Sequence, residues 1–445
     1  MRNLFRTYSS HYRALLKLGL PIVVAQFGIV VFAIADTLMV GHHAVAELSS
    51  AGFVNNTFNM AIVASIGFAL GLTPVVGALY GRGEYEAIGR KLRNALAANL
   101  LTSFLLMGCM FIFYLNIDRM GQPVELLPII KPYFLTILFS IPFLMLFNAF
   151  RQCVDGVQDT RISMWILLVG NLAHIGTNYL FIYGPGPFPE WGLFGAGVST
   201  LTMRILMCLT FAFIFFHRKR YAPYWKGFKQ GRVNRADFVQ LNKLGWPVAL
   251  QMFMETASFS LCAIMVGWLG ARELATHQVM LSISTLFFMM YLGMGSAVAV
   301  RVSYFRGQGD VQNLRRSAVA GFHLVMLIAL ACSLFVGSLR NHIGVWFTDD
   351  VAVAQAIPAL VIPLLLYQLG DGLQITFSNA LRGLTDVRAV VVYAFISYFL
   401  ISLPISYCFA FVFDWKLPGI WYSFSVGLTC AGLLYSTRFF RRTCM

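Results

Sequence analysis

Twelve long apolar runs constrain the fold of this 445-residue chain more than any other feature. Each is long enough to cross the roughly 30 Å hydrocarbon core of a bilayer as a helix. Because backbone polar groups cannot stay unpaired in lipid, a chain of such runs can only form a bundle of membrane helices. The predicted spans are residues 14–41, 51–79, 93–115, 128–154, 162–183, 194–216, 240–267, 275–304, 316–338, 357–381, 389–413 and 418–437.

Composition excludes the soluble alternatives. Hydrophobic residues make up 58% of the chain and charged residues only 11%, far too little charge for the surface of a soluble protein of this length. The net charge of +15 could indicate a nucleic-acid partner, but the basic residues lie where membrane topology requires them. We therefore expect the lipid bilayer, and no nucleic acid, as the environment of the chain.

The distribution of lysine and arginine predicts the orientation. With the N-terminus in the cytoplasm, the inner segments hold 27 of the 33 basic residues and the outer loops hold five, while Arg204 remains inside a span. Such an asymmetry places both termini on the cytoplasmic side. The expected location is the inner (plasma) membrane, crossed many times.

The two halves of the chain repeat. Adding 226 to the residue number maps Lys17-Leu18-Gly19 onto Lys243-Leu244-Gly245, and the same offset maps Gly81 and Gly83 onto Gly307 and Gly309. Six spans separate the copies, so both halves run the same way through the membrane. The axis that relates the two halves must then lie along the membrane normal. The sequence thus predicts an all-α polytopic fold of two pseudo-symmetric six-helix bundles in a V-shaped, alternating-access transporter. The expected parts are an N-terminal lobe at 1–216, a basic cytoplasmic linker at 217–243 and a C-terminal lobe at 244–445.

Two apolar spans carry matching polar stripes. Steps of four, three and four place residues on one helix face, and both stripes follow these steps. One comprises Tyr367, Asp371, Gln374 and Ser378, and the other comprises Gln251, Glu255, Ser258 and Cys262. An acid at mid-bilayer costs roughly 2.5–3.5 kcal/mol on an insertion scale, so two acids on matched stripes indicate a cavity that handles cations.

Three acids, Asp36, Glu255 and Asp371, lie within the spans. A buried carboxyl can carry a proton, bind a metal cation or face an organic cation, and competition among these uses is the minimum requirement for antiport. A structural ion pair is the alternative, with Arg204 as the one obvious basic partner.

A polar cluster is expected around Asp36, which follows Pro21 by fifteen residues in the first span. Proline permits a bend there, static or moving. In the fifth span Asn171, His174 and Asn178 share one face; they could surround Asp36 or form ordinary interhelical hydrogen bonds. Further candidates for lining a substrate cavity are Gln278, Asn59, Gln251, Gln374 and Ser378.

In its pattern of spans and polar residues the chain resembles the MATE (multidrug and toxic compound extrusion) family. The resemblance rests on the twelve spans in two halves, Asp36 ahead of TLMVG, Glu255 in PVALQMFMETASFS and the Tyr367–Asp371 pair, and both second-half acids make it similar to the NorM-like branch. It implies a Na+ site at Glu255, Asp371 and Tyr367. It also implies a first-half site at Asp36, Asn171 and Asn178, where protonation or sodium binding accompanies bending at Pro21.

The expected function is a cation-coupled (Na+ or H+) antiporter that exports organic cations or drugs by alternating access. The alternative is a flippase for a lipid-linked precursor of the same superfamily, which should have a strongly basic cavity. No arrangement of nucleophile and activating base predicts an enzyme. We expect a monomer with no cofactor beyond the transported ion, whose partners are small organic cations and the coupling cation.

Overall fold

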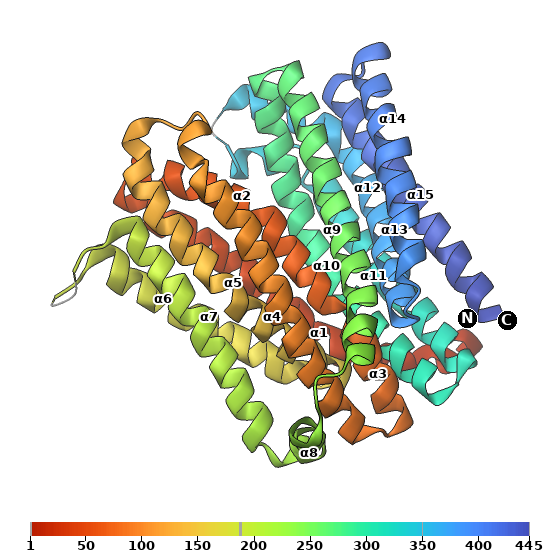
Figure 1. The fold of residues 1–445 in the computed structure, drawn as a ribbon. Helices are drawn as coiled ribbons and strands as arrows, with labels where there is room; N and C mark the ends of the chain where they lie inside the picture. Colours follow the sequence, from red (N-terminus) through yellow and green to blue (C-terminus); the bar gives the residue numbers. More distant parts are fainter. Residues whose placement is uncertain (1, 187–188, 349, 445) are drawn as a thin grey trace. The chain divides into compact units, whose positions relative to one another are not determined.

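A computed structural model describes the backbone of residues 2–186, 189–348 and 350–444, with side chains from Tyr8 onward. Within these residues all regular structure is helical, and twelve helices are long and apolar enough to cross a membrane. Each of them overlaps one of the predicted apolar runs. The predicted all-α, twelve-span architecture is therefore confirmed (Figure 1).

The spans follow one another with short connections. The first half contains α1 (Arg2–His43), α2 (Val45–Leu70), α3 (Thr73–Arg82), α4 (Tyr85–Leu115), α5 (Leu127–Gly156), α6 (Thr160–Tyr183) and α7 (Gly192–His217). A short helix, α8 (Ala222–Gln230), precedes the second half. That half contains α9 (Arg235–Leu269), α10 (Ala271–Gln308), α11 (Val311–Ser338), α12 (Val351–Gly383), α13 (Val387–Phe395), α14 (Leu403–Tyr407) and α15 (Lys416–Cys444).

The chain divides into two compact units that do not end where the sequence repeat does. One unit is Val24–Ala249; the other combines Met1–Val23 with Leu250–Met445, and we call them the first and second unit. Helices α1 and α9 therefore each begin in one unit and end in the other. Each helix changes unit just after a proline, Pro21 in α1 and Pro247 in α9. The lobes expected at 1–216 and 244–445 stay a prediction.

The core of the first unit surrounds α5, which packs against α2, α4 and α7. The rings of Phe58 and Phe134 lie 4.6 Å apart between α2 and α5, and both side chains are fully buried. Burying an aromatic side chain of this size removes about 150–250 Å² from solvent, so such pairs dominate the packing energy.

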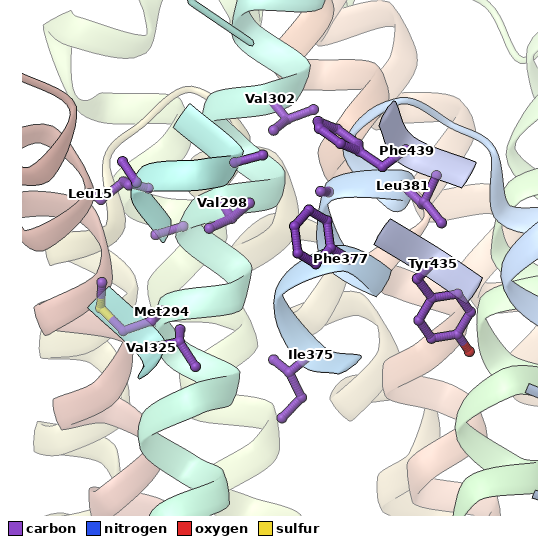
Figure 2. Close-up of a cluster of buried hydrophobic side chains, with 14 of the residues drawn as sticks. Leu15, Met294, Val298, Val302, Val325, Ile375, Phe377, Leu381, Tyr435 and Phe439 are labelled. Carbon is purple, nitrogen blue, oxygen red and sulfur yellow. The ribbon is translucent and has the colours of Figure 1, made fainter. Parts of the chain in front are cut away.

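In the second unit α12 is the central helix and packs against α10, α11 and α15. Figure 2 shows Val298 from α10, Phe377 from α12 and Phe439 from α15 in one buried cluster. The start of α1 belongs to this core, because Leu15 is fully buried in the same cluster. The contact is close: a side chain on Gly19 would lie 2.5 Å from the sulfur of Met294.

Matching turns give the sequence repeat a structural counterpart. Helices α3 and α10 both end at glycines with left-handed backbone, Gly83 at φ 76° and Gly309 at φ 73°, which glycine adopts without steric cost. Gln158, just before α6, and Thr385, just before α13, are left-handed too, at φ 64° and 60°. Gly83 and Gly309 are one of the pairs that the repeat relates.

Two spans depart from the continuous helices that their apolar runs suggest. The second span breaks at Gly71, between α2 and α3, where Gly71 comes so close to the backbone of Gly245 that a side chain would not fit. Pro74 lies in the first turn of α3, and the repeat places Val300 at the equivalent position of the unbroken α10. The eleventh span contains two π-helical segments, Ile396–Ser402 and Cys408–Val412, around Pro404.

Candidate functional site

The stripe predicted on α12 is buried inside the second unit. Tyr367, Asp371, Gln374 and Ser378 are 6%, 1%, 1% and 2% exposed. The Gln374 side-chain amide donates to the Tyr398 hydroxyl over 2.8 Å, and the Ser378 hydroxyl donates to a backbone carbonyl of its own helix. The spacing along the helix thus places all four side chains in the interior, away from lipid.

The stripe on α9 lies in the same unit. The Gln251 amide donates to a carboxylate oxygen of Glu255 over 2.8 Å, while Glu255 itself is only partly buried. Further along the stripe, Ser258 is buried and the Cys262 thiol lies 3.5 Å from the Ser406 hydroxyl. Glu255 is therefore the most accessible polar residue of this stripe.

The two acids interact with each other. The charge of Glu255 acts electrostatically on Asp371, and the charges of both carboxylates act on the Tyr367 hydroxyl. One oxygen of Asp371, Oδ2, is buried without a hydrogen-bond partner among the described residues. A buried polar atom of this kind calls for a proton, a water or an ion. The structure thus brings together the three residues expected to hold sodium.

Oxygen atoms are the donors that this group offers. Among the described residues no group of three or more His, Cys, Asp or Glu side chains is arranged so that it could hold a metal ion. Two carboxylates and the Tyr367 hydroxyl suit a hard cation or a proton better than a transition metal, which prefers imidazole or thiolate. The donor set therefore fits Na+ or H+.

Arg382 belongs to this site and was not among the predicted residues. It is 6% exposed, and its Nη2 donates to Gln251 Oε1 over 2.6 Å. Its charge also acts on Glu255. The sequence did contain a signal, because Arg382 lies four residues after Ser378 and continues the stripe of α12.

Aromatic rings enclose Tyr367 in the same unit. The ring of Trp421 lies 5.5 Å away and those of Phe259 and Phe424 lie 6.3 and 6.4 Å away. Trp421 and Phe424 also flank His277, a fully buried residue whose two ring nitrogens have no hydrogen-bond partner in the described part of the chain. One side of the predicted cation site is therefore an aromatic wall, of the kind that also attracts organic cations.

The first unit holds the second predicted cluster. Asn178 donates its side-chain amide to Asp36 Oδ1 over 2.6 Å, which joins α6 to α1. The amide nitrogen of Asn171 is buried and finds no partner within the described ranges. His174 instead contacts the Thr200 hydroxyl at 3.2 Å and packs on Phe32 at 4.3 Å between ring centres. Of the three, Asn178 is the one that shows a direct bond to the acid.

Arg204 does not form an ion pair with Asp36 among the described residues. Its Nη1 donates to the Ser140 hydroxyl over 2.6 Å, and its charge acts on Tyr133 and His174. Tyr133 in turn donates to Asn55 over 3.1 Å. This partly buried base thus lies among hydroxyl groups and does not neutralise the acid directly.

The remaining predicted residues lie apart from these clusters. Asn59 and Gln278 are exposed on α2 and α10, whereas Gln251 is buried with both ends of its amide bonded. Pro21 lies inside α1, as expected. The roles assigned to these residues remain predictions.

Comparison with known proteins agrees with this picture. The family model described as MatE matches residues 21–180 and 247–408, two segments whose first residues differ in number by the offset of the repeat. The chain is 29% identical over 443 residues to the multidrug resistance protein NorM of Vibrio vulnificus (strain CMCP6), covering 97% of this chain and 95% of that protein.

Solved structures share the fold. A multidrug resistance MATE family transporter of the MOP superfamily, in an outward-facing conformation, matches with a TM-score of 0.86 and 18% identity, covering 98% of this chain and 96% of that one. The eukaryotic MATE transporter AtDTX14 matches with a TM-score of 0.85 and 16% identity over 98% of both chains. These likenesses concern the fold alone.

The matched family segments cover well over half of the chain, and the match to NorM extends over nearly its whole length. The proteins matched are transporters, so the prediction that the chain is not an enzyme is confirmed. With twelve apolar spans and a family match over both halves, the chain belongs to the MatE family of multidrug transporters.

Proposed function

We propose that this protein is a cation-coupled antiporter that exports organic cations across the cytoplasmic membrane by alternating access. The observation that carries the proposal is the buried carboxylate of Asp371, one oxygen of which has no hydrogen-bond partner among the described residues, next to the charge of Glu255. Two neighbouring acids in a low-dielectric interior are unfavourable unless a proton or cation neutralises them. A site of this kind is suited to alternate between a small ion and a positively charged substrate.

The proposed cycle uses this competition. When the second-unit site faces outward, Na+ or H+ enters at Glu255, Asp371 and Tyr367 and displaces the organic cation. The site then turns inward, releases the ion and reloads. One elementary charge moving through 100 mV supplies about 2.3 kcal/mol, which sustains a concentration ratio of roughly fifty if coupling is tight.

We assign a second ion-responsive position to Asp36. Its bond to Asn178 joins α1 to α6 only while the carboxylate accepts that hydrogen bond, so protonation or ion binding would weaken the connection. Pro21 lies earlier on the same helix, close to where α1 passes between units. Bending of α1 at this proline is therefore the proposed response.

The remaining proposals follow from the sequence. The protein works as a monomer in the inner (plasma) membrane with both termini in the cytoplasm, and needs no cofactor beyond the transported ion. Its substrates are small organic cations, in keeping with the name of its multidrug relative. The flippase alternative receives no support from the family match.

The deciding experiment measures substrate efflux from vesicles under imposed sodium and proton gradients, applied separately. The wild-type protein should respond to at least one gradient. Asp371→Asn and Glu255→Gln should abolish the response while the protein remains in the membrane, because each removes a charge needed to bind the ion. Asp414→Asn, an exposed acid of the same unit, is the matched control and should transport normally. Unimpaired ion-driven efflux in both site variants would refute the proposed site.

A further inference from the structure

Arg382 is a buried base whose hydrogen-bond partners are neutral. The ion pairs recorded among the described residues do not include it, although only 6% of the residue is exposed. Its two terminal nitrogens donate to side-chain oxygens of neutral amides, Gln251 at 2.6 Å and Asn379 at 3.4 Å. Burying a guanidinium without a bonded carboxylate is costly, so its position calls for a function.

Hydrogen-bond chemistry fixes how the Gln251 amide is turned. A guanidinium can only donate hydrogen bonds, so the group of Gln251 that faces Arg382 must be its carbonyl oxygen. The amide nitrogen then has to face Glu255, where it donates to Oε2 over 2.8 Å. This orientation follows from the donor and acceptor roles alone, and it removes the Gln251 oxygen from the atoms that could bind a cation.

The first unit has the same kind of amide-to-acid hydrogen bond, but there no basic side chain among the described residues bonds to the oxygen of the amide. Asn178 donates to Asp36 over 2.6 Å, and the Asn178 side-chain oxygen has no partner among the described residues. The repeat offset of 227 places Asp155 at the position equivalent to Arg382, and Asp155 is bonded within its own unit to Ser163 at 2.7 Å. An arginine held against the amide is therefore specific to the second unit.

We propose that Arg382 is a positioning residue for the coupling cation, acting through Gln251. It holds the amide so that the nitrogen donates to Glu255 and the oxygen is withheld from the ion. The inference rests on the proposed antiport function. We call the chain of contacts from Arg382 through Gln251 to Glu255 the relay. Because of the relay, the ion must compete with a hydrogen bond at Glu255 and gains no ligand from Gln251. The ion therefore binds weakly enough to be released on the inner side.

The test is a sodium titration of ion-driven efflux in reconstituted vesicles. Arg382→Gln frees the Gln251 amide to turn its oxygen toward the ion. The expected result is a sodium concentration for half-maximal efflux about tenfold lower than in the wild type, with a slower maximal rate. Arg382→Lys keeps a buried donor and should stay within about threefold of the wild type. If efflux follows the proton gradient instead, the same variants are compared by the pH of half-maximal efflux, with an alkaline shift of about one unit expected for Arg382→Gln.

A matched control and a double-variant cycle separate the relay from a general effect of charge. Arg301→Gln removes a partly buried arginine of the same unit that lies over the Tyr304 and Phe305 rings. It should leave the sodium concentration for half-maximal efflux, the midpoint of the titration, unchanged. Gln251→Leu alone should also lower the midpoint. In that background Arg382→Gln should change it by less than about threefold, since the residue through which Arg382 acts is gone.

The outcomes distinguish the two proposals. If Glu255→Gln keeps ion-driven efflux, the antiport site itself is wrong. If Glu255→Gln loses efflux while Arg382→Gln and Gln251→Leu both keep the wild-type midpoint, only the role of Arg382 is overturned. If Arg382→Gln fails to reach the membrane, Gln251→Leu decides: an unchanged midpoint overturns the relay.

Discussion

An amide group contacts an acid in each unit, but the two contacts differ in what supports them. Asp36 accepts directly from Asn178, whose other end makes no hydrogen bond within the described residues. Glu255 accepts from Gln251, whose other end is held by Arg382. A charge-assisted hydrogen bond contributes about 1.5–3 kcal/mol, and losing the donor leaves a partly buried acid without its amide partner. Each acid should therefore depend strongly on its own amide.

Replacing Asn178 should affect transport much more than replacing its neighbour Asn171. Asn178→Leu removes the donor to Asp36 and should lower the initial rate of ethidium efflux at least tenfold, because the ionised form of Asp36 loses its recorded side-chain partner. Asn171→Leu should stay within about threefold, since the amide nitrogen of Asn171 makes no hydrogen bond to the described residues. Rates are compared per amount of protein in the membrane. Equal losses in both variants would contradict this ranking.

Residue spacing predicted the buried stripes well, because residues three or four apart must share a face of any helix. The same spacing continues to Arg382, but that residue lies one position beyond the predicted span 357–381 and was not among the predicted site residues. Long basic side chains at span ends usually extend toward the headgroups. The side chain instead points inward, because Gln251 and Asn379 offer it acceptor oxygens there.

Helices α1 and α9 pass from one compact unit to the other just after Pro21 and Pro247, which the repeat relates. A proline removes one backbone hydrogen bond and leaves a point where a helix can bend at low cost. The coincidence of both prolines with the unit boundary leads us to predict that each acts as a hinge. This pairing could be suspected from the offset of 226, but the boundary itself comes from packing.

Both prolines should be needed for fast turnover. Pro21→Ala and Pro247→Ala each restore the missing N–H and stiffen the helix, and we expect maximal efflux to fall about fivefold or more. The sodium or proton concentration for half-maximal efflux should change little, because neither residue belongs to the predicted ion site. Pro358→Ala, within α12 and away from the boundary, provides the control. Normal rates in both hinge variants would show that the bends are static.

Hydropathy predicted where spans lie but not how regular they are. Residues 51–79 form one apolar run, yet the structure divides it at Gly71 because two backbones meet there and a new helix follows with Pro74 in its first turn. Hydropathy does not distinguish the π-helical segments of the eleventh span from the rest of its apolar run either, although Pro404 lies between them. Such features depend on close contacts between elements, which a profile of hydrophobicity does not contain.

Across the whole chain, the duplication was visible in sequence while the grouping into compact units was not. Equivalent glycines and equivalent left-handed turns recur at the expected offset. The segment Met1–Val23 nevertheless packs with the second half, where Gly293 lets the backbone of Val23 approach α10. A contact between segments so distant in the sequence cannot be inferred from local periodicity, so the composition of the compact units comes from packing alone.

The distribution of basic residues predicts how the whole molecule is oriented in the membrane. Glu125 and Gln230 are both exposed, in a predicted outer loop and in the predicted cytoplasmic linker respectively. In a background with the exposed Cys109, Cys408 and Cys444 replaced by serine, Glu125→Cys should react with a membrane-impermeant maleimide in intact cells. Gln230→Cys should react only after permeabilisation, because the predicted topology places 27 of the 33 basic residues, including those of the linker, on the cytoplasmic side. The reverse labelling pattern would invert the topology and, with it, the direction of transport proposed here.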